Sequence, residues 1–436
     1  MLRHYRYMAK GAAGMRSRNF ITFSLFLICI FVLIIGPSCI QKTEAPVEIK
    51  TINVGCIMPF SGAAAMYGNE TRQDMDIYVS LMNHSGGVKI GSDVYQVALH
   101  YADDGMQVAP SAAAARKLIY DEGVTAIVGY FGIGYSAVAP LTNADKIIFV
   151  ARSGADVNIN VQRDKYVIIG LPTAQYTLNQ VIVAMTAHPE AKILGWTGPE
   201  GAKESISSSA DPVDKWLEAE KGIKNVRVFY PPGTTNFVPY LLKMKEQGVQ
   251  LIYNGGTLLD TCLMAKQFGE VGFRIPLSNG SDNEMAIMKS VAGLDAIQGI
   301  IANQTAPWEL KKTKVAQRYL EMADKIRKTY QETYGKPMPH YGSFVIGLNQ
   351  LGQYLEACQV AGSTDPDTVM TAFKTATIDT FIGSYKLTGT KTFGMPIAFG
   401  YPCAMGIIKG DQSVYLDEYP LTDVDIWFNE LSRYKR

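Results

Sequence analysis

The segment of residues 51–68, TINVGCIMPFSGAAAMYG, constrains the fold more than any other part of the chain. It has the pattern of a buried strand that ends in a loop of small residues, which Tyr67 and Gly68 close, and a helical pattern follows at once. In open α/β sheets, ligands bind at the carboxyl ends of the strands. The segment therefore predicts one edge of a ligand site, made of loop N–H groups and the Tyr67 ring.

The first 39 residues have the pattern of an export signal. Basic residues without any acidic residue precede the apolar run 20–35, and small residues then lead to Cys39. A basic start, an apolar core and a small-residue exit are typical of a secretory signal. The run is shorter than the about 20 residues that span a bilayer, which makes a transmembrane anchor the second choice. Residues 40–48 are polar and suit a short tether.

Cys39 gives this signal a further resemblance, to the bacterial lipoprotein signal, in which the Cys is lipidated and becomes the N-terminus of the mature chain. Gly36 stands where that signal usually has Leu, and Pro37 is also unusual. We expect lipidation at Cys39; the alternative is an ordinary signal peptide with an incidental Cys.

Length and composition restrict the function of the rest of the chain. About 390 residues exceed what one core usually holds, so two lobes are expected. The formal net charge is +1 and the basic residues are scattered, so there is no electrostatic signal for nucleic-acid binding. The cysteines form no CxxC pair, the histidines have no metal spacing, and no nucleophile–base arrangement stands out. These patterns argue against a zinc, redox or hydrolytic site.

Strand-like and helix-like segments alternate along the chain in two arrays. The first array ends with a strand at residues 147–150, and the second runs from a helix at 175–187 to a strand at 275–277. Such alternation predicts right-handed βαβ units on parallel sheets. Long amphipathic helices at 314–334 and 344–361 follow. Short strand candidates then close the chain at 381–387, 398–401 and 404–409.

Four segments, in order, carry a resemblance to a known family. They are INVGCIMPFSGAAAMYG, a helix ending in NHSGGV, a strand ending in YADDG, and AAAARKLIYDEGVTAIVGYFGIGYSAVAPL. This order resembles the branched-chain amino-acid-binding (leucine-binding) proteins, over residues 49 to about 415. The resemblance implies an α/β protein with the type I periplasmic-binding fold, in which two Rossmann-like lobes, joined by three crossovers, surround a ligand cleft.

The resemblance also implies where the chain changes lobe. We place the crossovers near residues 171–174, 303–308 and 378–381. Lobe 1 then comprises residues 49–172 and 308–379, and lobe 2 comprises residues 173–307 and 380–436.

The function implied is that of an exported receptor, not an enzyme, with no cofactor. It would capture a small amphipathic solute, an amino acid or a related aromatic compound, by hinge closure, and deliver it to the membrane subunits of an ABC permease. We expect a monomer in the periplasm or at the cell surface, held to the membrane by its N-terminal lipid. The alternative is a sensing receptor of the same fold that signals to a membrane partner.

Two loops of lobe 1 carry aromatic candidates for ligand contact. In relatives, an aromatic residue at the position of Tyr67 packs on the ligand. The second loop carries Tyr130, Phe131 and Tyr135, and it has Ile133 where amino-acid binders have a Ser that holds the α-carboxylate. We therefore expect a ligand other than leucine, isoleucine or valine, stacked on at least one of these rings. The alternative is that two of the three rings pack into the lobe.

The second loop also matches a dinucleotide-binding fingerprint formally. It reads Gly132-x-Gly134-x-x-Ala137, with Asp156 about 20 residues further on. The motif follows the third strand rather than the first, in a chain with an export signal. An oxidoreductase is therefore a minor alternative.

The remaining candidates lie in loops that follow later strands. In the third loop of lobe 1, the resemblance implies that Ser153 and the Ala155 N–H bind the ligand. Arg152 faces a ligand anion; the alternative is that it pairs with Asp156 or lies at the solvated rim. In lobe 2, Thr257 and Asp282 are candidates, although an acid in a Gly/Ser loop often caps the next helix instead. Weaker lobe 2 candidates are Trp196, which is equally suited to the core, and Glu200.

Overall fold

The computed structural model describes residues 49–130, 132, 134–153, 159–160, 162–282, 284–338, 343–420 and 423–425. The chain separates into Met1–Val47 and one compact unit, Glu48–Arg436, which contains all of the described residues. The predicted export signal, the tether and Cys39 lie outside them. Within the described part of the chain, every helix is too short or too polar to cross a membrane.

Lobe 1 is built on a six-stranded sheet with the order β2-β3-β1-β4-β5-β6. All neighbouring strands are parallel except β2 and β3. The strands are β1 (Ile49–Met58), β2 (Val88–Ile90), β3 (Asp93–Asp103), β4 (Ala126–Val128), β5 (Ile148–Ser153) and β6 (Val167–Pro172). The helices are α2 (Ala65–His84), α3 (Val108–Arg116), α4 (Tyr135–Ala144), α10 (Gln317–Tyr334), α11 (Leu348–Ala361), α12 (Pro366–Thr375) and the short α13 (Thr390–Phe393). Two short strands, β12 (Ile378–Thr380) and β13 (Gly383–Tyr385), pair with each other in a separate sheet.

Lobe 2 is built on a seven-stranded sheet with the order β15-β14-β11-β10-β9-β7-β8, in which β14 and β15 run antiparallel to their neighbours. The strands are β7 (Ile193–Pro199), β8 (Lys224–Tyr230), β9 (Leu251–Asn254), β10 (Leu277–Asp282), β11 (Ile301–Asn303), β14 (Cys403–Lys409) and β15 (Gln412–Tyr419). The helices are α5 (Thr173–Ala187), α6 (Lys203–Lys221), α7 (Val238–Glu246), α8 (Leu258–Gln267) and α9 (Met285–Ala292).

Helices cover both faces of each sheet, so strands such as β4, β9 and β11 are buried on both sides, as is usual for parallel sheets. On β1, Val54 and Cys56 belong to one core cluster with residues of α2 and α11, whereas Ile57 belongs to a second cluster with residues of α3 and α4. The first cluster also contains residues of lobe 2, among them Trp196 and Tyr253. The two lobes thus share one core on the side of α5 and α11.

The first two changes of lobe follow the ends of β6 and β11. Strand β6 ends at Pro172 and α5 begins at Thr173, so the first crossover has no loop. In the second crossover, the Gln304 N–H donates to the Ala404 carbonyl of lobe 2 at 2.8 Å. The Trp308 ring then packs edge-on against Phe344 of lobe 1, with centroids 5.3 Å apart.

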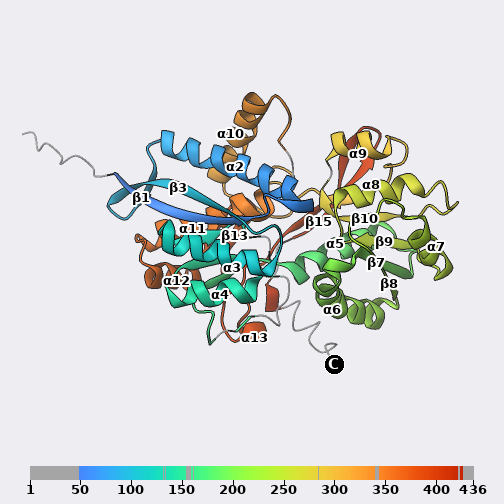
Figure 1. Ribbon diagram of the computed structural model, residues 1–436, viewed down its shortest axis with the longest axis horizontal. Coiled ribbons are helices and arrows are strands. Elements are labelled where there is room, and N and C mark those ends of the chain that lie inside the picture. Colours follow the sequence, from blue (N-terminus) through green and yellow to red (C-terminus); the bar gives the residue numbers. More distant parts are fainter. Residues whose placement is uncertain are drawn as a thin grey trace, which may run out of the picture. The chain divides into compact units, whose positions relative to one another are not determined.

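The third change of lobe differs from the prediction. Residues 378–399 stay with lobe 1, because Phe381 packs edge-on against Tyr78 and the Phe399 N–H donates to the Ile169 carbonyl of β6. The chain changes lobe near Tyr401, before β14 begins at Cys403. The predicted assignment of residues 380–399 to lobe 2 is therefore corrected. In Figure 1 the orange helices α10 to α12 accordingly lie among the blue and teal elements of lobe 1, and the red β15 reaches the green and yellow lobe 2.

Candidate functional site

The loop after β1 is fixed by a carboxylate at the end of β3. Asp103 accepts hydrogen bonds from the N–H groups of Phe60 at 2.7 Å and Gly105 at 2.9 Å. Burial works against ionisation of Asp103, but hydrogen bonds from Ser61, Gly105 and Phe60 outweigh it and lower its pKa. Gly68 lets α2 begin directly against this loop, because a Cβ there would lie 2.0 Å from the Pro59 carbonyl oxygen.

Tyr67 lies half-buried in the first turn of α2 and reaches lobe 2. Its hydroxyl oxygen accepts from the backbone N–H of Leu258, the first residue of α8, at 3.4 Å. Tyr67 therefore joins the strand ends of the two lobes, at the position that the sequence predicted for the pocket wall. Its contact with a ligand stays a prediction.

The start of α8 is held by its own side chains. Asn254, fully buried at the end of β9, accepts from the Gly256 N–H at 2.9 Å and donates to the Thr261 hydroxyl at 2.8 Å. Thr257 and Asp260 form a capping box, in which the Thr257 hydroxyl accepts from the Asp260 N–H at 3.2 Å. The Thr257 hydroxyl thus serves the helix, and ligand contact by this residue stays a prediction.

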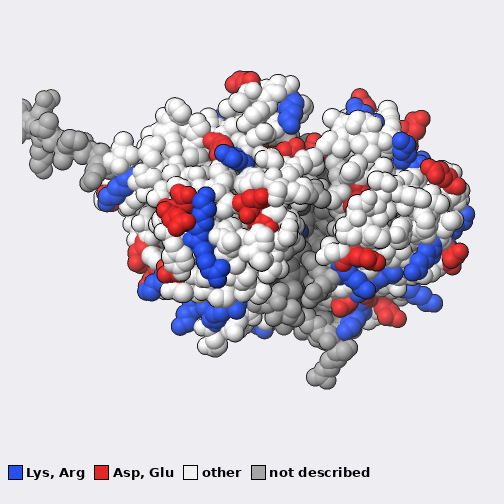
Figure 2. Space-filling model, viewed as in Figure 1, with Lys and Arg blue, Asp and Glu red and all other residues white. Residues whose placement is uncertain are grey.

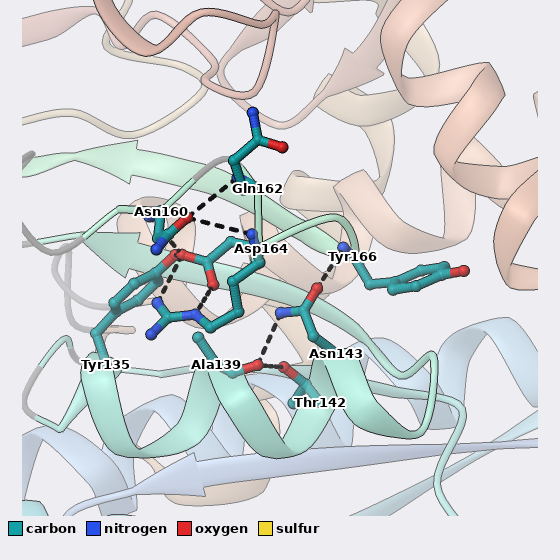
Figure 3. Close-up of polar contacts among 9 residues, drawn as sticks. Tyr135, Ala139, Thr142, Asn143, Asn160, Gln162, Asp164 and Tyr166 are labelled. Carbon is teal, nitrogen blue, oxygen red and sulfur yellow. Dashed lines mark hydrogen bonds and ion pairs between the residues drawn. The ribbon is translucent and has the colours of Figure 1, made fainter.

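Tyr130 and Tyr135, predicted for the second loop, lie inside lobe 1. Tyr130 is fully buried and packs edge-on against Phe149, with ring centroids 5.2 Å apart. Tyr135 donates its hydroxyl to Asp164 at 2.9 Å, and the same carboxylate accepts from the Asn160 N–H at 2.9 Å (Figure 3). Burial raises the pKa of both tyrosines. Both rings therefore pack into lobe 1, which was the alternative to ligand contact.

Other members of the predicted site fall outside the described residues. These are Phe131, Ile133, Ala155 and Asp156. Ser153 is described only as the last residue of β5. Arg152 lies before it and donates from Nε to the Thr173 hydroxyl at 3.4 Å, which connects the end of β5 to the first crossover.

The other three candidates of lobe 2 lie in or directly after strands β10 and β7. Asp282 is the last residue of β10 and pairs with Asn303 of β11. Glu200 is exposed in a short turn after β7. Trp196 is fully buried and donates its indole N–H to Asp214 on α6 at 2.6 Å, which places it in the core rather than at a strand end.

A pair of acidic residues from different lobes, Glu70 and Glu284, could not be predicted from the sequence. Glu70 lies one turn after Tyr67 on α2, and Glu284 precedes α9 of lobe 2. Burial, then the charge of Glu284, raise the pKa of Glu70 to about 7, against an opposing effect of Lys336. Only the folded chain brings these two acids together, so periodicity and motif spacing do not find them.

The described residues contain no group of acidic, His and Cys side chains that could hold a metal ion. Cys56, Cys262, Cys358 and Cys403 are buried free thiols. In Figure 2 acidic and basic side chains are mixed over the visible face, and a groove runs between the two lobes.

Comparisons with known proteins agree with this architecture. A family model described as periplasmic binding protein matches residues 51–400. Leu/Ile/Val-binding protein homolog 2 of Brucella abortus is 23% identical over 347 residues, which cover 77% of this chain and 85% of that protein. The leucine-, isoleucine-, valine-, threonine-, and alanine-binding protein of Pseudomonas aeruginosa is 24% identical over 342 residues, with the same coverage of both chains.

Solved structures show the same fold. A leucine-binding protein of Thermotoga maritima has a TM-score of 0.66 at 19% identity, covering 85% of this chain and 99% of its own. A solute-binding protein of an ABC transporter from R. palustris, solved in complex with benzoate, has a TM-score of 0.65 at 18% identity, covering 86% and 98%. The two sheets and their crossovers therefore form the type I periplasmic-binding fold.

Proposed function

The chain belongs to the periplasmic binding protein family, and we propose that it is an exported receptor that captures a small amphipathic solute between its lobes. The observation that carries this proposal is the contact between the Tyr67 hydroxyl and the Leu258 N–H. It joins the first turn of α2 to the start of α8, so a solute at this edge would touch both lobes. Binding to both lobes favours the closed arrangement, as in other hinge proteins.

The proposed solute is an aromatic acid or a related amino acid rather than leucine, isoleucine or valine. Ile133 stands where amino-acid-binding relatives have the Ser that holds the α-carboxylate, and Tyr67 supplies an aromatic ring where the two lobes meet. Relatives of this fold include a benzoate complex and an isoleucine complex, so the fold accommodates both classes.

The proposal includes delivery to an ABC permease and a lipid anchor at Cys39. The apolar run 20–35 and the small residues before Cys39 support export. Mass spectrometry of the chain from membranes tests the anchor: the expected result is a diacylglyceryl group on an N-terminal Cys39, and an unmodified mature chain contradicts it.

A thermal-shift screen over amino acids, aromatic acids and amides tests the solute class. A ligand at about 100 times its Kd stabilises the fold by about 3 kcal/mol. We expect such a shift with an aromatic acid such as 4-hydroxybenzoate. A comparable shift with L-leucine contradicts the solute class, and no shift with any compound contradicts the receptor function.

A further inference from the structure

Each lobe contains the same arrangement behind the carboxyl end of one strand. In lobe 1 the Gly170 carbonyl of β6 accepts a hydrogen bond from the side-chain amide of Gln353 on α11, at 3.4 Å. In lobe 2 the Gly280 carbonyl of β10 accepts from the side-chain amide of Gln180 on α5, at 3.2 Å. Gln353 and Gln180 are 0% and 1% exposed, so a solute does not reach either.

In lobe 1 the glycine marks a shift in strand register. Ala151 pairs with Ile169, whereas Arg152 pairs with Leu171, so Gly170 has no partner in the β5–β6 ladder. A bulge of this kind bends the strand and re-aims the residues that follow. The residues that follow on β6 are Leu171 and Pro172, which pair with Arg152 and Ser153 at the end of β5, where the sequence placed ligand contacts.

In lobe 2 the shift is larger. Asn279 pairs with Ala302, and the next pair is Asp282 with Asn303, so Gly280 and the residue after it have no partner in the β10–β11 ladder. The shift lies directly before Asp282, the acidic candidate of this lobe. In both lobes, then, the register changes at the residues predicted to meet the solute.

Neither glycine has room for a side chain. A Cβ on Gly170 would lie 2.6 Å from Gln353 Oε1 and 2.8 Å from Val150 Cγ1. A Cβ on Gly280 would lie 2.7 Å from the Tyr253 hydroxyl. The missing side chains thus provide the space in which the glutamine and tyrosine groups reach the main chain.

The two glutamines are held to different degrees. The Tyr253 hydroxyl donates to Gln180 Oε1, which leaves the Gln180 amide nitrogen facing the Gly280 carbonyl. Tyr253 is fixed in turn by edge-on packing against Trp196, with ring centroids 5.0 Å apart. In lobe 1, Gln353 Oε1 has no hydrogen-bond partner. Gln180 is therefore the more firmly oriented of the two.

We propose that Gln180 and Gln353 are positioning residues, which hold the two register shifts and so set the strand ends at Asp282 and Ser153 for solute binding. This role rests on the proposed function for its consequence in affinity. The structural part, that each glutamine holds a strand end, does not depend on any solute. Gly170 is buried and Gly280 is half-buried, so their carbonyls have limited access to water and need a donor, which these amides supply.

Hydrogen exchange of the full chain without added solute tests the structural part. Gln180→Met and Gln353→Met keep the side-chain length but remove the donor. Gln350→Met is the matched control, because Gln350 is fully buried on α11 and neither of its amide atoms has a hydrogen-bond partner. We expect exchange of residues 279–284 to become about 5-fold faster in Gln180→Met, as for loss of a net hydrogen bond of about 1 kcal/mol.

The corresponding result for lobe 1 is a smaller acceleration at residues 150–153 in Gln353→Met. Exchange that is unchanged in both variants overturns the proposal. The same acceleration at residues 150–153 in the Gln350→Met control also overturns it, since the effect then belongs to the altered core and not to the hydrogen bond.

Gln180→Glu provides a second readout. Its carboxyl group keeps an acceptor for the Tyr253 hydroxyl, but the ionised form has no proton to donate to Gly280. We expect near-normal protection of residues 279–284 at pH 5, where a buried carboxyl is neutral and donates, and loss of protection at pH 8, after correction for intrinsic exchange rates. If the protection of residues 279–284 in Gln180→Glu changes with pH no more than it does in the wild type or in Gln180→Met, the proposed role of the hydrogen-bond donor is overturned.

Isothermal titration with 4-hydroxybenzoate and L-isoleucine connects the glutamines to binding. A probe that binds the wild type is expected to bind Gln180→Met about 5-fold more weakly and Gln350→Met equally well. Equal affinity of all three proteins overturns the positioning role. If neither probe binds the wild type, the solute class of the proposed function fails, and the exchange experiment still decides whether the glutamines hold the strand ends.

Discussion

Glu70 on α2 and Glu284 before α9 bring like charges together from different lobes, and the pKa of Glu70 rises to about 7 as a result of burial and of this neighbour. An acid whose folded-state pKa lies above its ordinary value, here 4.5, stabilises the fold below pH 4.5 relative to high pH. That stability is lost as the pH rises through 7.

The substitution Glu70→Gln is therefore expected to raise the Tm at pH 8, by about 2 °C, and to leave it unchanged at pH 5. At pH 8 the wild type carries a half-buried charge that Gln lacks, whereas at pH 5 both side chains are neutral. Scanning calorimetry at the two pH values measures this. Glu270→Gln, at an exposed position, is the control and should change neither value. An equal shift at both pH values would falsify the electrostatic explanation.

Tyr67 should contribute to solute binding mainly through its ring. Tyr67→Phe removes the hydroxyl that accepts from the Leu258 N–H, at the long distance of 3.4 Å, and keeps the ring, so it is expected to weaken binding less than about 3-fold. Tyr67→Ala also removes the aromatic surface and should weaken binding more than about 10-fold. Titration calorimetry with the tightest compound of the screen measures both. Wild-type affinity in Tyr67→Ala would exclude the ring from the site.

Gly68 should tolerate no side chain. Gly68→Ala places a Cβ 2.0 Å from the Pro59 carbonyl oxygen and must move either the loop or α2, at a cost of about 2 kcal/mol in the free energy of unfolding. Gly269→Ala is the control, because a Cβ there has no atom within 4 Å. Urea unfolding measures the free energy of unfolding of both variants. Equal values would mean that the loop after β1 moves without a cost in stability.

Trp196 should affect stability and not affinity. Trp196→Phe removes the donor to Asp214 and leaves unfilled volume in the core, which is expected to cost about 2 kcal/mol. Because Phe keeps an aromatic ring for Tyr253 to pack against, the solute affinity should stay within about 2-fold of the wild type. A large loss of affinity at unchanged stability would contradict the core role and indicate that Trp196 contacts the ligand. Trp216→Phe, at a half-buried position on α6, serves as the milder comparison.

The order of strands and helices could largely be predicted from the sequence, because apolar runs and Gly-rich stops are local signals. Gly86 and Gly87, both with positive φ, end α2 where the sequence predicted it. The predictions missed several elements, among them β6, whose apolar run contains Gly170, and β15, whose half-exposed residues form a hairpin with β14. They also missed the third crossover, because contacts such as Phe381 against Tyr78 join residues far apart in the chain.

The site was harder to predict from the sequence, because its contacts also join residues that are far apart in the chain. The sequence indicates which strand ends carry polar and aromatic residues, and Tyr67 does reach the other lobe. It does not show that the Tyr135 ring turns inward to Asp164. The pairing of Gln180 with Gly280 joins residues 100 positions apart and has no local signal.

The core that α5 and α11 share has a consequence for how such proteins diverge. Cys56 of one sheet and Trp196 of the other belong to one apolar cluster, so neither half buries its own surface completely. Cutting or exchanging one lobe would expose that surface to water. We expect the two halves to melt as one cooperative unit, and new solute preferences to arise by changing strand-end loops within an intact chain rather than by exchanging halves between relatives.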